Sequence, residues 1–258
     1  MLSKNLDKAK QAFKNKNIEE TKRAHDAKVH EPHGASGKYI KSFVYGGLDG
    51  VITTFAVVAG VAGASLAAKI VLILGFANLV ADGISMAIGD YLSTRAENDY
   101  NRAEREREAW EVENYPQGEK KEMIELYQEK GISEEDARQV VEILSKHKEA
   151  WVDVMMKEEL GIIEDNHSPA KNALVTFIAF AVFGFVPLLT YVTANFVPGI
   201  GPYSFLTACV LTGTTLFLLG ALKSRVVGTK WYRSGIEMLL VGGIAAVVAY
   251  IVGVILGG

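Results

Sequence analysis

Glutamates spaced one helical turn apart are the residues of this chain whose pattern is most typical of chemistry. Glu108 and Glu111 are three residues apart, and Glu119 and Glu122 repeat that spacing shortly afterwards. Residues three or four apart share a face of a helix, where like charges repel each other and mildly destabilise it. A bound cation removes that repulsion, and carboxylate oxygens suit divalent ions. The spacing therefore favours a divalent-metal site.

A third segment of the same charged block adds sulfur. Met155 and Met156 precede Glu159 by about one turn, which places thioethers beside a carboxylate. Thioether ligands shift the preference of a site toward softer, later metals. The mixture indicates Fe²⁺ as the metal, with Zn²⁺, Co²⁺ and Mn²⁺ as alternatives. The alternative for these glutamates is a solvated helix face balanced by Arg105 and Arg107, but the combined pattern favours metal.

The distribution of charge places this block in a membrane protein. Charged residues gather in residues 1–41 and 95–171, and the rest of the chain is nearly free of them. A helix needs about 20 mostly apolar residues to cross the roughly 30 Å hydrocarbon core of a bilayer. The uncharged stretch 172–222 holds two such segments, because the turn-forming run 195–202 interrupts it. The predicted spans are residues 42–64, 69–93, 172–194, 203–222 and 235–256.

The predicted fold is an all-α integral membrane protein with five transmembrane helices and a cytosolic helical metal-binding domain between spans two and three. Basic residues in short loops stay on the cytosolic side of a membrane. Four of them lie in the loop 223–233, and Lys38 and Lys41 precede the first span. The N-terminus and the inserted domain are therefore predicted to face the cytosol. The predicted domains are residues 1–41 (N-terminal segment), 42–94 (spans one and two), 95–171 (metal-binding insert) and 172–258 (spans three to five).

The insert is predicted to be a folded set of helices. The second span continues as a charged helix to Asn114, and Pro116 and Gly118 break it. Ser133 with Asp136 resembles a capping box that opens a later helix. A small set of helices buries only a small core. We therefore expect a ligand or a partner subunit to contribute to the stability of the insert. The predicted insert helices are residues 95–114, 119–129, 133–146 and 149–160.

Asp49 lies inside the first predicted span. An Asp at the centre of a bilayer costs about 2.5–3.5 kcal/mol on the insertion scale, so it is a functional candidate by default. Thr53 is one turn further on and shares the face of Asp49. Gly46 and Gly50 have the small-xxx-small spacing that permits close approach of another helix. We predict that Asp49 and Thr53 line a transport pathway.

The second predicted span carries a polar stripe, in which Asn78, Asp82, Met86 and Asp90 are spaced four residues apart. If it faces the first span, this stripe offers oxygen and sulfur ligands along a path, and its carboxylates could carry protons in the opposite direction. Asn78, Asp82 and Met86 are therefore assigned to the pathway. For Asp90, near the cytosolic end of the span, a snorkelling or capping role is an equal alternative. A structural role is favoured for Glu237 in the fifth span.

Taken together, these segments resemble the vacuolar iron transporter family. The matching segments are Asp49-Gly50 with Thr53, residues 60–64, 83–86 and 187–189, and the Met155-Met156-x-x-Glu159 run. They occur in a consistent order from about residue 38 to residue 256. The resemblance implies a five-span homodimer with its pore between the two first spans, driven by proton antiport. It also implies a cytosolic domain that gathers Fe²⁺.

The resemblance also assigns ligands. Asp49 and Met86 match the family's pore ligands. The residues that match its cytosolic metal ligands are Glu108, Glu111, Glu119, Glu122, Met155, Met156 and Glu159. In one respect the chain departs from the pattern, because the family has a glutamate where this chain has Asn78 and a small residue where it has Asp82. The acid has thus moved by one turn, which leaves a carboxylate in the pathway.

The predicted function is a proton-coupled antiporter that moves Fe²⁺, or Mn²⁺, Co²⁺ or Zn²⁺, out of the cytosol into an organelle lumen or the exterior. Divalent metal is its substrate, and no tightly bound cofactor is expected. The alternatives are a membrane-anchored di-metal ferroxidase and a metal sensor. The ferroxidase lacks the usual Glu-x-x-His ligand pair and would leave Asp49 and Asp82 without a task.

Partners other than metal ions and protons are expected to be membrane lipid and a second copy of the chain. The sequence contains no phosphate-binding loop, catalytic triad or nucleic-acid signature, so neither ATP hydrolysis nor nucleic-acid binding is expected. The membrane would be vacuolar in a eukaryote and the plasma membrane in a prokaryote. The run His30-Glu31-Pro32-His33 is interpreted as a linker in preference to a metal-collecting tail.

Overall fold

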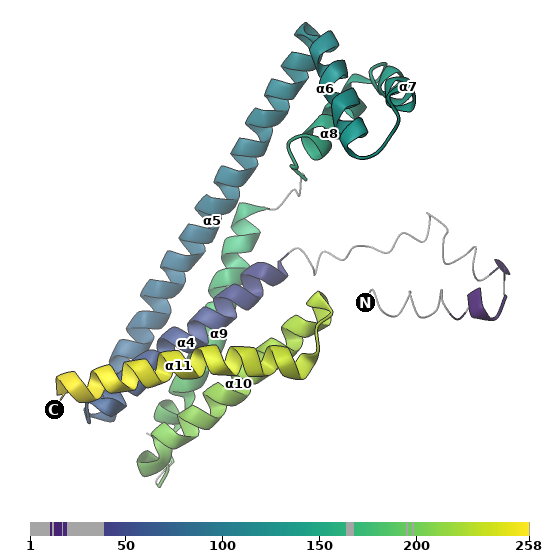
Figure 1. Ribbon diagram of the computed structural model, residues 1–258. Coiled ribbons are helices and arrows are strands. Elements are labelled where there is room, and N and C mark those ends of the chain that lie inside the picture. The colour runs from purple at the N-terminus through teal and green to yellow at the C-terminus, as the bar shows by residue number, and fades with distance from the viewer. Residues whose placement is uncertain are drawn as a thin grey trace. The chain divides into compact units, whose positions relative to one another are not determined.

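Five long apolar helices dominate the computed structural model (Figure 1). They are α4 (Ile40–Gly63), α5 (Ala68–Asn114), α9 (Pro169–Ala194), α10 (Ser204–Val227) and α11 (Trp231–Gly257). Each contains a stretch that is long and apolar enough to cross a membrane. The prediction of an all-α, five-span, multi-pass membrane protein is therefore confirmed. The structure describes residues 11, 13–16, 18–19, 39–163, 168–194, 196–197 and 199–257, so the segment from His30 to His33 lies outside the described residues.

The chain forms two compact units. One unit, called here the membrane unit, comprises the chain up to Tyr91 and from Ala170 onward, and the other, called here the insert, comprises Leu92–Pro169. The helix α5 contributes its first part to the membrane unit and its last part to the insert. Three short helices, α6 (Pro116–Glu129), α7 (Glu134–Leu144) and α8 (Lys148–Glu158), follow it within the insert.

The ends of the insert helices follow local rules of helix capping. The predicted start of α6 at Glu119 is wrong by three residues, because the helix begins at Pro116. Proline is favoured at the first helical position, where its missing N–H needs no partner. The predicted cap of α7 is confirmed, since the backbone N–H of Asp136 donates to Ser133 Oγ at 3.2 Å. The early start of α6 places Glu119 in its first turn.

A small apolar core holds the helices of the insert together. Its buried members are Val112, Met123, Val141, Trp151, Val152, Met155 and Met156. Ion pairs fasten α8 to α5 around this core. Arg105 Nη1 lies 2.5 Å from Asp153 Oδ1, and Lys148 Nζ lies 2.5 Å from Glu113 Oε2. The position of α8 relative to the end of α5 is thus fixed by both apolar and charged contacts.

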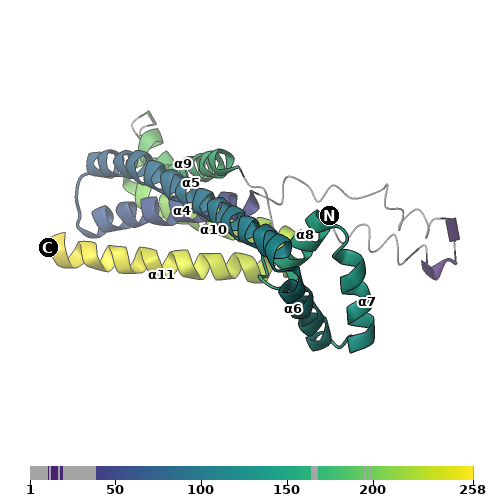
Figure 2. The same ribbon diagram turned by 90° about the horizontal axis from the view of Figure 1, so that it is seen from above.

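Glycines allow the helices of the membrane unit to approach α4 closely. The helix α11 packs along α4 and α10, and Figure 2 shows α11 running beside α4. A Cβ added at Gly253 of α11 would lie 2.1 Å from the carbonyl oxygen of Gly60. On another side, a Cβ at Gly50 would lie 2.3 Å from the carbonyl oxygen of Phe180 in α9. Small residues are the usual means of helix association in lipid, and here they fix the helix that carries Asp49.

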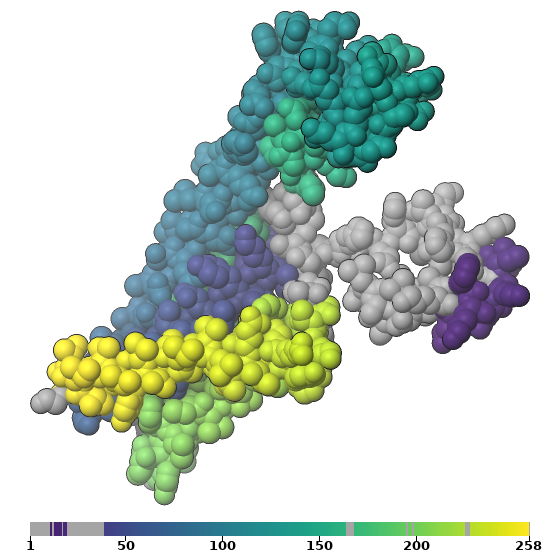
Figure 3. All heavy atoms as spheres, viewed as in Figure 1, coloured from purple at the N-terminus to yellow at the C-terminus, as the bar shows by residue number. Residues whose placement is uncertain are grey.

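The outer face of α11 is apolar and uncovered. Ile244, Val248, Ile251 and Ile255 follow each other at helical spacing and are all at least half exposed. Figure 3 shows α11, in yellow, uncovered on the side of the molecule that faces the viewer. So large an apolar surface is typical of a helix that contacts lipid.

Replacement of Gly253 by alanine should loosen the contact between α4 and α11. The added methyl group overlaps a backbone oxygen, and such overpacking costs about 1–3 kcal/mol. Thermal unfolding of the detergent-solubilised protein should show a transition several degrees below that of the wild type. The matched control is Gly243→Ala in the same helix, where an added Cβ meets nothing within 4 Å. Equal losses for the two variants would contradict the close-packing argument.

Candidate metal centre and membrane pathway

Three glutamates from three segments of the insert bring carboxylate oxygens together. One oxygen from each of Glu108 in α5, Glu119 in α6 and Glu159 at the C-terminal cap of α8 lies within 4.8 Å of the others. We call these residues the glutamate cluster. Glu108 is only 1% exposed and Glu119 only 4%, whereas Glu159 is open to solvent. Oxygen atoms gathered at one accessible point are suitable ligands for a divalent cation.

Two oxygens of the glutamate cluster are buried without a hydrogen-bond partner. They are Oε2 of Glu108 and Oε2 of Glu119. An ionised carboxylate only accepts hydrogen bonds, and a buried polar atom left unpaired carries most of its desolvation cost. A cation at this point would provide the missing interaction. Burial therefore distinguishes the cluster from an ordinary solvated face of a glutamate-rich helix.

The members of the glutamate cluster have raised pKa values. Burial, together with the charges of Glu122, Glu108, Glu111 and Glu159, raises the pKa of Glu119 to about 7. Burial is also the largest cause of the raised pKa values of Glu108 and Glu159. The charges of Glu111 and Glu122 act on all three members of the cluster. The five predicted glutamates are therefore one electrostatic group, although only three of them bring oxygens together.

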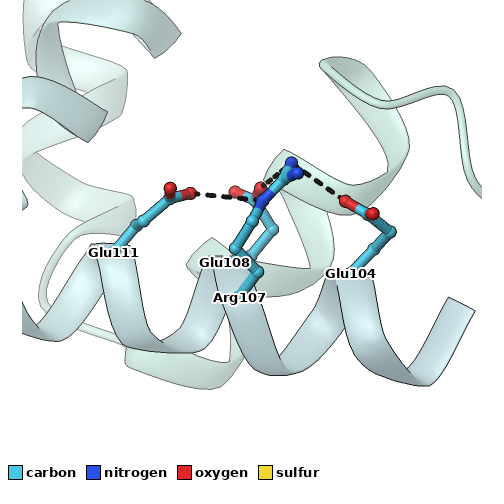
Figure 4. A network of polar contacts seen from close by, with 4 residues as sticks. All are labelled: Glu104, Arg107, Glu108 and Glu111. Carbon is cyan, nitrogen blue, oxygen red and sulfur yellow. Dashed lines mark hydrogen bonds and ion pairs between the residues drawn. The ribbon is translucent and has the colours of Figure 1, made fainter. Parts of the chain in front are cut away.

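Arg107 interacts with the glutamates along α5 (Figure 4). Its Nη2 atom lies 2.9 Å from Glu104 Oε2 and 3.3 Å from Glu108 Oε1. Its Nε atom lies 3.7 Å from Glu111 Oε2. Figure 4 shows the guanidinium group reaching carboxylates on both sides of it along one helix. Glu111, a predicted metal ligand, is thus paired with Arg107 in this structure.

The predicted sulfur ligands lie in the apolar core of the insert. Met155 and Met156 are each 2% exposed, and they belong to the cluster of buried residues that contains Trp151. Both precede Glu159 by about one helical turn, so they share a face of α8 with this member of the glutamate cluster. Glu122, the remaining predicted ligand, is exposed on α6.

In the membrane unit, the polar residues predicted on the first two spans meet. The side-chain amide of Asn78 in α5 donates to Thr53 Oγ1 at 3.3 Å and to Thr54 Oγ1 at 3.4 Å in α4. Thr53 in turn donates to the backbone oxygen of Asp49 at 2.8 Å. The polar stripe of α5 therefore faces α4 at this level. The spacing rules assigned no role to Thr54, which joins the same network.

The two intramembrane acids of the predicted pathway are electrostatic neighbours. The charge of Asp82 acts on Asp49, and both residues are half-buried. Met86 is also half-buried and packs against the main apolar core of the membrane unit. Asp90 instead accepts a hydrogen bond from the hydroxyl of Thr176 in α9. That bond supports the structural alternative for Asp90.

Glu237 also has a structural partner. Its Oε2 atom lies 3.7 Å from Lys223 Nζ, so the pair links α11 to α10. This ion pair agrees with the structural role that the sequence favours for Glu237. The candidates for the pathway remain the predicted residues on α4 and α5.

Comparison with known proteins identifies the family. The model of the VIT family matches residues 40–254 of the chain. The chain belongs to the VIT family. Among its relatives is a vacuolar iron transporter of Toxoplasma gondii (strain ATCC 50861 / VEG), 43% identical over 98% of this chain and 89% of the relative. A vacuolar iron transporter of Plasmodium falciparum (isolate 3D7) is 40% identical over 99% of this chain and 98% of the relative. Vacuolar iron transporter 1 of Arabidopsis thaliana is 33% identical over 85% of this chain and 87% of the relative.

These relatives confirm the resemblance inferred from the motifs of the sequence. They are named as transporters, which supports the transporter interpretation of this VIT family member over the ferroxidase alternative. The family model covers the glutamate cluster and the five long helices, except for the C-terminal end of α11.

The pKa of Glu119 predicts how the metal-free protein responds to pH. Because its pKa in the folded state, about 7, exceeds the ordinary value of 4.5, protonation stabilises the fold. This stabilisation is complete below about pH 4.5 and is lost as the pH rises through 7. Thermal unfolding in a metal-free buffer should therefore occur at a lower temperature at pH 8 than at pH 5. The variant Glu119→Gln should weaken this dependence, and an identical pH dependence in both proteins would contradict the assigned burial.

Proposed function

We propose that this VIT family member is an antiporter that moves Fe²⁺ from the cytosol into an organelle in exchange for protons. The observation that carries the proposal is the pair of carboxylates, Asp49 and Asp82, in the mostly apolar membrane segments of two neighbouring helices. Acids within a membrane are costly and mark ion pathways. The names of the relatives support iron as the transported ion and the vacuole as the organelle. Mn²⁺, Co²⁺ and Zn²⁺ are alternative substrates, because their ligand preferences overlap with those of Fe²⁺.

In this proposal the insert collects metal on the cytosolic side. The glutamate cluster supplies the oxygens that first hold the ion, and the buried, unpartnered atoms of Glu108 and Glu119 support that role. Glu111 and Glu122 add negative charge nearby. The proposed cytosolic ligand set is Glu108, Glu111, Glu119, Glu122, Met155, Met156 and Glu159.

Inside the membrane, the ion passes residues of α4 and α5. Asp49 and Met86 are the proposed ligands, and Thr53, Asn78 and Asp82 line the path. Metal binds to deprotonated carboxylates and so releases protons, and protons from the far side displace it in turn. Two adjacent acids therefore couple metal and proton movement without a further energy source.

The topology belongs to the same proposal. The N-terminus and the insert face the cytosol, as the basic residues from Lys223 to Arg233 indicate; they lie at the end of α10, in the short turn after it and at the start of α11. The functional unit is a homodimer in which the α4 helices of the two copies border the pore, as the resemblance implies. The membrane is vacuolar, in keeping with the names of the relatives.

Uptake of Fe²⁺ into proteoliposomes tests the antiport mechanism. With the lumen acidic, the wild type should accumulate Fe²⁺, and uptake should fall at least tenfold when the pH gradient is collapsed. Asp49→Ala should abolish uptake, because it removes a charged ligand from the pathway. Glu237→Ala is the matched control, since that acid pairs with Lys223 and lies outside the proposed pathway. Undiminished flux through Asp49→Ala, or flux that needs no gradient, would show that the mechanism is wrong.

The role of the insert is tested by the double variant Glu108→Gln with Glu119→Gln. Its uptake should saturate at a metal concentration several times higher than that of the wild type, with a similar maximal rate, because collection is impaired and the pathway is intact. Glu125→Gln is the control, because Glu125 lies on α6 but pairs with Lys121 on the surface. If the control shifts saturation as much as the double variant does, the cluster has no special role in collecting metal.

A further inference from the structure

Arg107 already supplies a positive charge to the acidic group of the insert. Its guanidinium contacts the carboxylates of Glu104, Glu108 and Glu111, at distances from 2.9 to 3.7 Å (Figure 4). Glu108 is at the same time a member of the glutamate cluster. The same carboxylate thus interacts with a resident cation and contributes to the proposed metal site.

The burial of these groups shows which of them is able to move. The side chain of Glu108 is 1% exposed, whereas that of Arg107 is 50% exposed. A long side chain with its charged end near solvent changes conformation at a small cost. Arg107 is therefore able to leave the carboxylates, while Glu108 remains in place.

The neighbouring Arg105 has a different arrangement. It pairs with Glu149 at 3.3 Å and with Asp153 at 2.5 Å, both of which are on α8. Arg105 thus links two helices, whereas the contacts of Arg107 described above remain on α5, including the glutamates one turn before and after it. The contacts of Arg107 are consequently more important for charge than for the docking of helices.

We infer that Arg107 is a resident cation that sets the metal affinity of the glutamate cluster. This inference rests on the proposed function of the cluster as a collector of divalent metal. Without metal, Arg107 offsets the repulsion among Glu104, Glu108 and Glu111. A divalent ion and a guanidinium repel each other at these distances, so the incoming metal displaces Arg107 toward solvent. The competition weakens metal binding and promotes release of the ion to the pathway.

The test compares Arg107→Gln with the wild type by isothermal titration with Co²⁺, a redox-stable probe. The full-length protein in detergent is titrated at pH 8, where protons compete less for the carboxylates. The heat that disappears in Glu108→Gln with Glu119→Gln is assigned to the cluster. Arg107→Gln should tighten that binding about tenfold, because the variant removes the positive charge that competes with the metal. It should also enlarge the rise in unfolding temperature that Co²⁺ produces.

Two further variants separate charge from structure. Arg138→Gln removes an equal charge from the insert, but Arg138 pairs with Glu134 on α7, so Co²⁺ affinity should stay within twofold of the wild type. Arg107→Lys keeps the charge and should bind Co²⁺ with an affinity closer to that of the wild type than to that of Arg107→Gln. Lys binding as tightly as Gln would overturn the role of the charge.

The remaining outcomes are also decisive. Weaker or unchanged Co²⁺ binding in Arg107→Gln would overturn the inference and would leave the cluster as a metal site, provided that the wild type shows the assigned heat. If the wild type shows no heat that depends on Glu108 and Glu119, the proposed metal collection fails, and the inference fails with it.

Discussion

Carboxylates that crowd together away from water repel each other, and the insert is built around that constraint. Glu108 and Glu119 are buried, each with one oxygen that lacks a hydrogen-bond partner, and other glutamates surround them. Burial and like charge both favour the protonated form, which is why the pKa of Glu119 rises to about 7. The apolar core and the ion pairs between α5 and α8 hold the glutamates together despite this repulsion. Such an arrangement of carboxylates favours the binding of a cation.

The membrane unit meets a related constraint in a different way. An acid in an apolar helix needs polar neighbours, and close helix packing brings them to it. Glycines let α9 and α11 approach α4 to backbone contact, while α5 places Asn78 against Thr53. Asn78, Thr53 and Thr54 form hydrogen bonds with one another, whereas Asp49 lies within the electrostatic influence of Asp82. The local chemistry of the proposed pathway therefore depends on helix contacts that small residues permit.

Much of this architecture follows from the sequence because its signals are local. The five spans follow from long uncharged stretches, and the cap at Ser133 follows from spacing alone. Local spacing alone does not show which glutamates come together in the fold. Glu159 reaches Glu108 only because α8 docks on α5, and Glu119 joins them because α6 begins at Pro116. The spacing of Arg107 between Glu104 and Glu111 is evident in the sequence. The burial of Glu108, which Arg107 also contacts, is not evident there, because it results from the tertiary fold.

A site that collects an ion for transport must also release it, because conduction requires binding that is neither too weak nor too strong. Three carboxylate oxygens within 4.8 Å would by themselves favour retention of a divalent ion. The proposed pathway offers a poorer ligand set at Asp49 and Met86, so transfer from the insert would be unfavourable unless the affinity of the insert were reduced. In the proposed mechanism, protons and Arg107 both compete for the same carboxylates, and each lowers that affinity without removing a ligand. In this proposal collection and release are compatible, because protons and Arg107 compete with the metal for the same acidic group.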